Sequence, residues 1–198
     1  EDITVTGTGT DAMIFNAGSS TAAGTSTGGN IIISGSPTFT TGSGGRMTYY
    51  TGSISGSTGL TSLIGSGTSQ FRYNSDETTT NYSAALTSGK YGIYREQPTL
   101  TITAASETVT YGTAPTPTVT ITGMQNGDAS GTVVTTAASI SIGGTTSTSG
   151  NYTAGSHTIT PSAAASTYGY GFGYTAGTLT VSPKAITYSI TAGAITYG

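Results

Sequence analysis

The feature that most restricts the fold is a stretch of the sequence that occurs twice. Residues 100–112 read LTITAASETVTYG, and a related ITYSITAGAITYG stands at residues 186–198. Tyr111 and Tyr197, the tyrosines of the two Tyr-Gly pairs, lie 86 residues apart. This is the length of a small β-sandwich domain and too long for one unit of a short solenoid. We therefore expect a module that starts near residue 98 and starts again near residue 185, as in part of a longer tandem array.

Composition favours β-structure for the whole chain. Charged residues make up 7% of it, against about 25% in an ordinary globular domain, and glycine occupies 31 positions. Thr, Val, Ile and Tyr suit a pleated surface, while glycine suits turns. A disordered Gly/Ser linker is the alternative, but disordered chains are poor in aromatic residues, and this one contains 13 Tyr and 4 Phe. The sequence therefore predicts an all-β protein.

Charge, hydropathy and cysteine content exclude several classes of function. Five Lys and Arg residues in a chain of net charge −3 cannot neutralise a track of phosphates, so no nucleic-acid partner is expected. No apolar run approaches the ~18 residues that cross a bilayer, so we expect no membrane insertion of this segment. The absence of cysteine excludes disulfides, thiolate chemistry and zinc sites with sulfur ligands.

Short apolar runs separated by glycine fill residues 1–52. They are too short for helices. Short strands joined by turns rich in Gly, Ser and Thr are typical of the coils of a parallel β-helix, in which each strand stacks on the strand one coil earlier. A sandwich of hairpins gives a similar spacing and is the alternative. The runs lie at residues 3–5, 12–15, 30–33, 38–40 and 46–50.

Residues 53–97 differ from the preceding stretch in composition, because charged side chains gather in their second half. The best helical candidate of the chain is 57–64, and strands are expected at 71–73 and 91–94. The open end of a β-helix exposes backbone that templates aggregation, so a cap of different composition is expected there. We interpret residues 53–97 as this cap and as the junction to the next domain, with Pro98 at the boundary.

Residues 98–184 carry turn signals about every eight to twelve residues, which is the spacing of a β-sandwich. Alternation of Leu100, Ile102 and Ala104 with threonines predicts one buried and one solvated face. Strands are expected at residues 99–104, 107–111, 117–122, 131–136, 139–142, 156–160, 170–175 and 178–182. Six aromatic side chains are expected to supply much of the core: Tyr111, Tyr152, Tyr168, Tyr170, Phe172 and Tyr174.

Residues 185–198 contain two strand-like runs that cannot form a sandwich by themselves. They could be disordered, pair with the preceding domain, or complete the domain of a neighbouring chain by strand addition. We expect pairing along the same chain, with the next repeat starting here.

Four spaced elements of the second half resemble the MBG domain, an immunoglobulin-like bacterial repeat found in large secreted adhesins. They are Tyr111-Gly112 with Pro115, the turn at residues 123–128 (GMQNGD), the stretch at 150–161 (GNYTAGSHTITP), and Tyr174 followed by residues 177–183 (GTLTVSP). The resemblance covers residues 99–184 and implies an immunoglobulin-like β-sandwich. Thr113 departs from the family, which usually carries Asp or Asn after Tyr-Gly, and this weakens any expectation of a cation in that loop.

Two stretches of the first half resemble the end of a filamentous haemagglutinin-type β-helix, as in two-partner secretion exoproteins. They are residues 41–52 (TGSGGRMTYYTG) and 71–76 (FRYNSD). The resemblance implies a right-handed parallel β-helix, capped and followed by the MBG repeat. It also implies export across both membranes of a Gram-negative bacterium and display at the cell surface or in an extracellular filament.

Few side chains are candidates for chemistry. His157 is the only histidine, but no Gly-x-Ser-x-Gly turn and no neighbouring carboxylate accompany it, so a catalytic triad is not expected. Asp76 and Glu77 could bind Ca²⁺, which needs six to eight oxygens, and a solvated pair or partners for Arg72 and Arg95 is favoured. We therefore expect no enzyme, no catalytic or metal-binding residues and no cofactor.

Two functions remain open from the sequence. The first is a structural stalk of a long surface adhesin or matrix fibre that mediates attachment and biofilm formation, with copies of itself or adjacent repeats as partners. The second is a module that binds extracellular polysaccharide or a receptor. Tyr49 and Tyr50 could stack on sugar rings in the second case, although packing inside the coil is the favoured interpretation of both.

Overall fold

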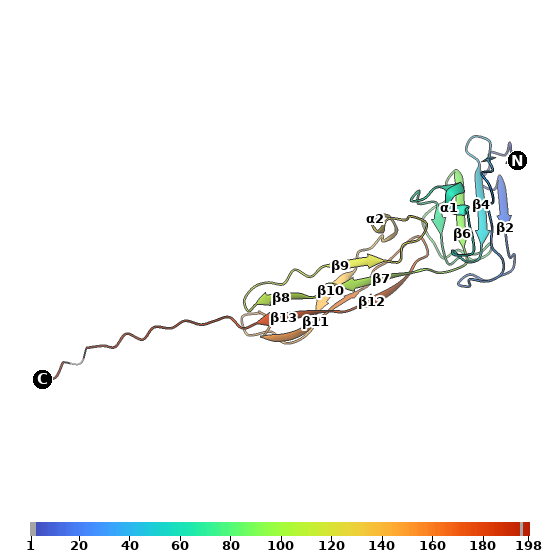
Figure 1. The fold of residues 1–198 in the computed structure, drawn as a ribbon. Coiled ribbons are helices and arrows are strands. Elements are labelled where there is room, and N and C mark those ends of the chain that lie inside the picture. Colours follow the sequence, from blue (N-terminus) through green and yellow to red (C-terminus); the bar gives the residue numbers. More distant parts are fainter. Residues whose placement is uncertain (1–2, 195) are drawn as a thin grey trace.

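The computed structural model describes residues 3–194 and 196–198, and strands dominate it. Two groups of strands lie end to end on either side of Pro98, and the last residues extend away from the second group (Figure 1). We call residues 3–97 the N-terminal part, 98–184 the C-terminal part and 185–198 the tail. The prediction of an all-β chain is confirmed.

Parallel strands build the N-terminal part. Its larger sheet has the order β2-β4-β6-β5, formed by β2 (Met13–Asn16), β4 (Arg46–Thr51), β6 (Gly89–Tyr94) and β5 (Phe71–Arg72). All three pairings in it are parallel. A smaller parallel pair joins β1 (Ile3–Thr4) to β3 (Phe39–Thr40). Strands from successive stretches of the chain thus lie side by side in the same direction.

The runs predicted in residues 3–50 form strands with one exception. Residues 30–33 form no strand, because the amide of Ile31 donates to the Thr51 side chain at 2.9 Å and that of Ile33 to the Thr58 carbonyl at 2.9 Å. These bonds go to scattered partners and build no ladder. The boundary expected at residue 52 lies between β4 and β6 in the sequence. These two strands pair with each other along the whole length of both, so the boundary does not separate two sheets.

The predicted helix at 57–64 is present in shortened form as α1 (Leu60–Ile64). Gly59 precedes it with φ 76°, a left-handed conformation that favours glycine and ends the loop before the first turn. Leu60 and Ile64 are buried, so the helix covers the sheet with one apolar edge.

Two sheets form the C-terminal part. One has the order β12-β7-β9, from β12 (Gly171–Thr175), β7 (Thr99–Ala104) and β9 (Val119–Thr122). The other has the order β10-β11-β13-β8, from β10 (Ser139–Ile142), β11 (Gly155–Ser162), β13 (Gly177–Ser182) and β8 (Glu107–Thr110). Pairing is mixed, because β12 is parallel to β7 and β13 to β8, while the remaining pairs are antiparallel.

Seven of the eight strands predicted in this part are present within about two residues of their expected ends. The strand expected at 131–136 is wrong, because α2 (Ser130–Val133) occupies that stretch. The amides of Val133 and Val134 donate to the carbonyls of Ala129 and Ser130. These amides are therefore bonded within a local turn and do not pair with a neighbouring strand. Val133 is fully buried against the N-terminal part, and this tertiary contact overrides the β-propensity of its sequence.

The buried side chains form two clusters of unequal size. The larger one fills the N-terminal part and crosses to Leu100, Val133 and Tyr170 of the C-terminal part. The smaller one lies between the two C-terminal sheets and contains Ala104, Ile159, Leu179 and Val181, with partly buried residues around them.

The predicted aromatic core of the C-terminal part is therefore only partly correct. Tyr111 and Tyr152 pack against the small cluster, but Tyr170 belongs to the large cluster. Tyr168 and Phe172 pack against that large cluster as well, and Tyr174 is 41% exposed. The predicted alternation of Leu100, Ile102 and Ala104 is confirmed, since all three are buried.

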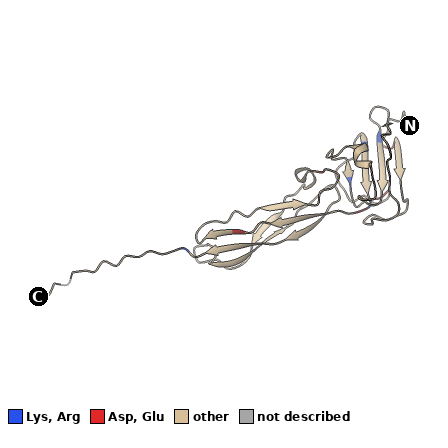
Figure 2. Cartoon of the chain, viewed as in Figure 1, with Lys and Arg blue, Asp and Glu red and all other residues tan. Residues whose placement is uncertain are grey.

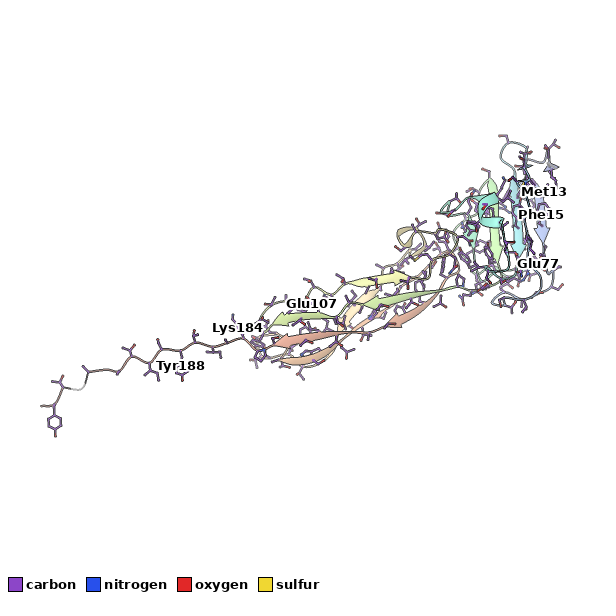
Figure 3. The ribbon with its side chains drawn as sticks, viewed as in Figure 1. Met13, Phe15, Glu77, Glu107, Lys184 and Tyr188 are labelled. Carbon is purple, nitrogen blue, oxygen red and sulfur yellow. The ribbon has the colours of Figure 1, made fainter. Side chains whose placement is uncertain are left out.

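The tail extends from the end of β13 without forming a strand in its described residues. Tyr188 projects from it into solvent and is 84% exposed (Figure 3). The expected pairing of the tail with the preceding domain is not formed in the structure, where Ile186, Tyr188 and Ile190 are 84 to 87% exposed. Among the residues that the structure describes, no helix has the length and apolar character needed to span a membrane.

Candidate functional site at the joint between the two parts

A polar network of side chains lies where the two parts meet. Its first element is the loop of residues 123–128, which follows β9 and turns against α1 and β5. Asn126 holds φ 51° and Gly127 φ 77°, as the Asn-Gly pair predicts. The Asn126 carbonyl accepts from the Gly67 amide at 3.0 Å, its side-chain oxygen accepts from the Thr61 hydroxyl at 2.6 Å, and its side-chain nitrogen donates to the Tyr73 hydroxyl at 3.0 Å.

Asp128 is the centre of this network. Its Oδ2 accepts from the Tyr73 hydroxyl at 2.9 Å and from the Tyr170 hydroxyl at 2.8 Å. The Tyr170 hydroxyl in turn accepts from the Gln125 amide at 3.0 Å, and the rings of Tyr73 and Tyr170 lie 4.5 Å apart between centroids. One carboxylate thus connects a tyrosine of each part.

Burial controls the ionisation of these groups. It raises the pKa of Asp128 from its usual value, and the hydroxyls of Tyr170 and Tyr73 together with the charge of Arg72 oppose this rise. Burial also raises the pKa of Tyr73 and of Tyr170, and it raises that of Tyr94 to about 12. The tyrosines therefore remain neutral hydroxyl donors at any physiological pH.

A second crossing of the joint passes through Gly169. The Tyr73 amide donates to the Tyr168 carbonyl at 3.0 Å, and the amides of Ser83 and Ala84 both donate to the Thr167 carbonyl at 3.0 Å. Gly169 has φ 92°, and a Cβ atom on it would stand 2.1 Å from the Tyr73 carbonyl oxygen. Only glycine permits the two backbones to approach so closely.

Arg72, the last residue of β5, lies beside the joint and contacts Tyr168 of the C-terminal part. Its guanidinium donates to the carbonyls of Ala84, Ser69, Phe71 and Ala85 at 2.8 to 3.1 Å. The rings of Tyr168, Tyr91 and Tyr82 surround it at 4.5, 5.5 and 5.6 Å from their centroids. Burial lowers its pKa, and the four carbonyls and three ring faces compensate for lost water.

His157 lies far from this network, between the C-terminal sheets. Its Nε2 is 2.7 Å from the Thr153 carbonyl, and its ring packs 5.2 Å from that of Tyr152. Gly144 has φ 101°, and a Cβ atom there would stand 2.1 Å from His157 Nδ1. Within residues 3–194 and 196–198, the His157 ring has no hydrogen bond to a carboxylate or a hydroxyl group. Its contacts are those of a side chain packed in the core.

Asp76 and Glu77 bind backbone amides, and not the arginines that the sequence suggested. Asp76 accepts from the amides of Ala23, Thr78 and Thr79 at 2.6 to 2.7 Å, and Glu77 accepts from that of Ser20 at 2.6 Å. Burial raises the pKa of Asp76, but these bonds outweigh it and lower the pKa to about 2. Both residues thus fasten the loop of residues 17–29 (Figure 3 labels Glu77).

Tyr49 belongs to the core, as favoured from the sequence. It is 1% exposed, and its ring stacks on that of Phe15 at 5.0 Å. It therefore has no face for a sugar, while Tyr50 on the opposite face of β4 is half-buried. Across residues 3–194 and 196–198, three or more His, Cys, Asp or Glu side chains never gather closely enough to hold a metal ion.

The sequence predicts the turn at residues 123–128 but does not indicate that this turn joins the two parts. The partners Tyr73 and Asp128 are separated by 55 residues in the chain, and no local pattern in one sequence links two such positions. The cluster of aromatic residues at 168–174 is the one local signal for the joint, but its pattern predicts the sandwich core instead.

Comparison with known families supports an assignment for the C-terminal part. The model of the MBG domain (YGX type) matches residues 100–180, a stretch that runs from β7 to β13 and includes both crossings of the joint. No curated protein and no solved structure was found to match the chain. The match supports an MBG-domain protein, and the MBG domain is a repeat domain of bacterial surface proteins.

Proposed function

We propose that the chain is a structural stalk segment of a long secreted bacterial surface adhesin or extracellular matrix fibre, with no enzymatic activity. The observation that carries this proposal is the joint. Hydrogen bonds that Asn126, Asp128 and Tyr168 accept tie the two parts together, and we expect the parts to move as one body. A rod that transmits force needs this property, whereas a flexible pair of binding domains does not.

The arrangement of the N-terminal strands supports a capped end of a right-handed parallel β-helix as the fold of this part. Met13 pairs with Met47 and Met47 with Lys90, all in parallel register, as between successive coils. The outer edges of β1 and β2 have no strand beside them in the described chain, and a further coil would fit there. Residues 1–52 would then be coils and 53–97 the cap and junction.

The C-terminal part is proposed to be one immunoglobulin-like bead, residues 98–184, in a series. Ile186, Tyr188 and Ile190 of the tail stand where Leu100, Ile102 and Ala104 stand in β7, and the latter three are buried. The exposed tail residues thus have the pattern of the first strand of another module. Adjacent repeats of the same chain are the proposed partners.

The MBG match supports a location outside the cell, and charged side chains are sparse along the whole ribbon (Figure 2). We propose export by two-partner secretion to the surface of a Gram-negative bacterium, where filaments of such modules mediate attachment and biofilm formation. Net charge has little influence on a fibre whose strength comes from backbone ladders.

Rotational diffusion of the full chain tests the stalk proposal. ¹⁵N relaxation should give one correlation time for amides of β4 and of β11. Asp128→Ala should separate the two values, because it removes the acceptor shared by Tyr73 and Tyr170, whereas Asp11→Ala, which removes an exposed charge remote from the joint, should leave them equal. Independent tumbling of the two parts in the unmodified chain would contradict the proposal.

A further inference from the structure

One cationic side chain of the N-terminal part has neither an ion pair nor a carbonyl partner among the described residues. Arg46 forms an ion pair with Asp11 at 3.2 Å, and Arg72 and Arg95 are buried and donate to backbone carbonyls. Lys90 is different, because its side chain makes no hydrogen bond or ion pair within the described chain. Its ammonium group is available to a molecule from outside.

The position of Lys90 in the sheet is unusual for a lysine. It stands second in β6 and pairs in parallel register with Met47, which itself pairs with Met13. Side chains at matched positions of parallel strands point to the same face, and Met47 on this face is 1% exposed. Lys90 therefore carries its charge along the core face of the sheet, where an apolar side chain would stabilise the fold more. The side chain is only half-buried, so its long stem can hold the ammonium group within reach of solvent and of a ligand.

Lys90 lines a cavity of about 340 Å³ between α1, β6 and the segment of residues 33–38. This volume is in the range of sites for small ligands. The remaining lining is of two kinds. Ile33, Pro37 and Leu63 provide apolar surface, while Ser36 and Ser62 provide hydroxyl groups.

We propose that this cavity binds a carboxylate-bearing sugar unit of an acidic polysaccharide. The single ammonium of Lys90 balances the single charge of a carboxylate, and it can donate three hydrogen bonds to it. The serine hydroxyls match the hydroxyl groups of the sugar, and the apolar residues match the C–H face of its ring. The single charge of Lys90 would neutralise only half of the charge of a doubly charged phosphate.

This inference goes beyond the stalk role, because a rod needs no ligand. The ligand would attach the segment laterally to a matrix, while the joint keeps the rod stiff. Failure of ligand binding would leave the relaxation experiment on the joint untouched, so the two proposals are tested separately.

Titration of the full chain with a galacturonate trisaccharide, followed by amide chemical shifts, tests the inference. We expect saturable shifts at residues 33–38 and 59–63, with weakening as salt is added. Lys90→Met should lower the affinity about tenfold or more, since hydrogen bonds to a charged group contribute about 1.5 to 3 kcal/mol. Lys184→Met removes the same charge outside the cavity and should bind as the unmodified chain does.

Three further ligands separate the contribution of the carboxylate from that of the sugar ring. A neutral glucose trisaccharide, acetate and inorganic phosphate should each bind more weakly than the acidic trisaccharide. The inference is overturned if Lys90→Met binds the acidic trisaccharide as tightly as the unmodified chain, if any of the three matches it, or if no saturable shift occurs. Lys90→Met should fold normally, because methionine continues the Met13 and Met47 row, and unchanged shifts in β4 would confirm this.

Discussion

The two parts of the chain are stabilised in different ways. The N-terminal part buries large side chains that make specific polar contacts, and its fully buried residues include Tyr49, Phe71, Tyr73, Tyr94 and Arg95. The cluster between the two C-terminal sheets has four buried hydrophobic residues, all aliphatic, and Ile102 and His157 are buried in the same part. Since each fully buried large apolar side chain contributes about 1.5 to 3 kcal/mol, the second core is much the weaker.

The joint compensates for this difference. Leu100, Val133 and Tyr170 belong to the C-terminal part by sequence but are buried in the large cluster. One end of the sandwich thus completes its core against the neighbouring part. We therefore expect an isolated bead of this kind to be marginally stable and to gain stability from its neighbours.

Matched leucine truncations should give the largest effect. Leu179→Ala removes one of four core residues, and a loss of about 2 to 5 kcal/mol should unfold the C-terminal part while the N-terminal part stays folded. Leu60→Ala makes the same chemical change in the larger cluster and should leave both parts folded. Hydrogen exchange of the amides in β4 and β13 measures this, and loss of protection in β4 first would contradict the comparison.

Arg72→Lys should give the next largest effect. A lysine can donate to some of the four carbonyls but cannot stack its charge flat between the tyrosine rings, so we expect a loss of about 2 kcal/mol. Urea unfolding monitored in β6 measures it. Arg46→Lys is the control, since a partly exposed ion pair contributes about 0 to 1 kcal/mol. Equal losses for the two variants would show that the carbonyl and ring contacts of Arg72 add nothing.

Acid should act on the two parts in opposite directions. The pKa of Asp76 is lowered to about 2, so its stabilising effect is present above its ordinary value of 3.8 and is lost as the pH falls through about 2. The pKa of Asp128 is raised, so its protonation on acidification favours the folded joint, and this contribution is lost as the pH rises through its folded-state pKa.

Variants of the two carboxylates separate these contributions. Unfolding as a function of pH should show a steeper acid loss in Asp128→Asn, which lacks the compensating group, and a shallower loss in Asp76→Asn. Identical pH profiles for both variants would refute the opposite signs.

The smallest effect is expected in the tail. Tyr188→Ser changes a side chain that is 84% exposed and should alter the free energy of unfolding by less than about 0.5 kcal/mol. Thermal unfolding measures this. A clear loss of stability would mean that the tail contacts the sandwich in solution.

The sequence predicted what local patterns control. Alternation located β7, and the Asn126-Gly127 pair located a turn with positive φ. Prediction failed where distant contacts decide the outcome. Val133 is helical because it is buried in the joint. Arg72 donates to carbonyls, although two carboxylates lie close to it in the sequence, because these carboxylates accept from backbone amides instead.

The parallel pairing of β13 with β8 has a mechanical consequence. The chain enters the sandwich at β7, beside the joint, and leaves it from the end of β13 at the opposite end (Figure 1). Tension along the chain therefore pulls β13 lengthwise past β8 and β11, while the hydrogen bonds between them run across the strands. All of these bonds carry the load together in shear, so the bead should extend little until a whole strand slides free.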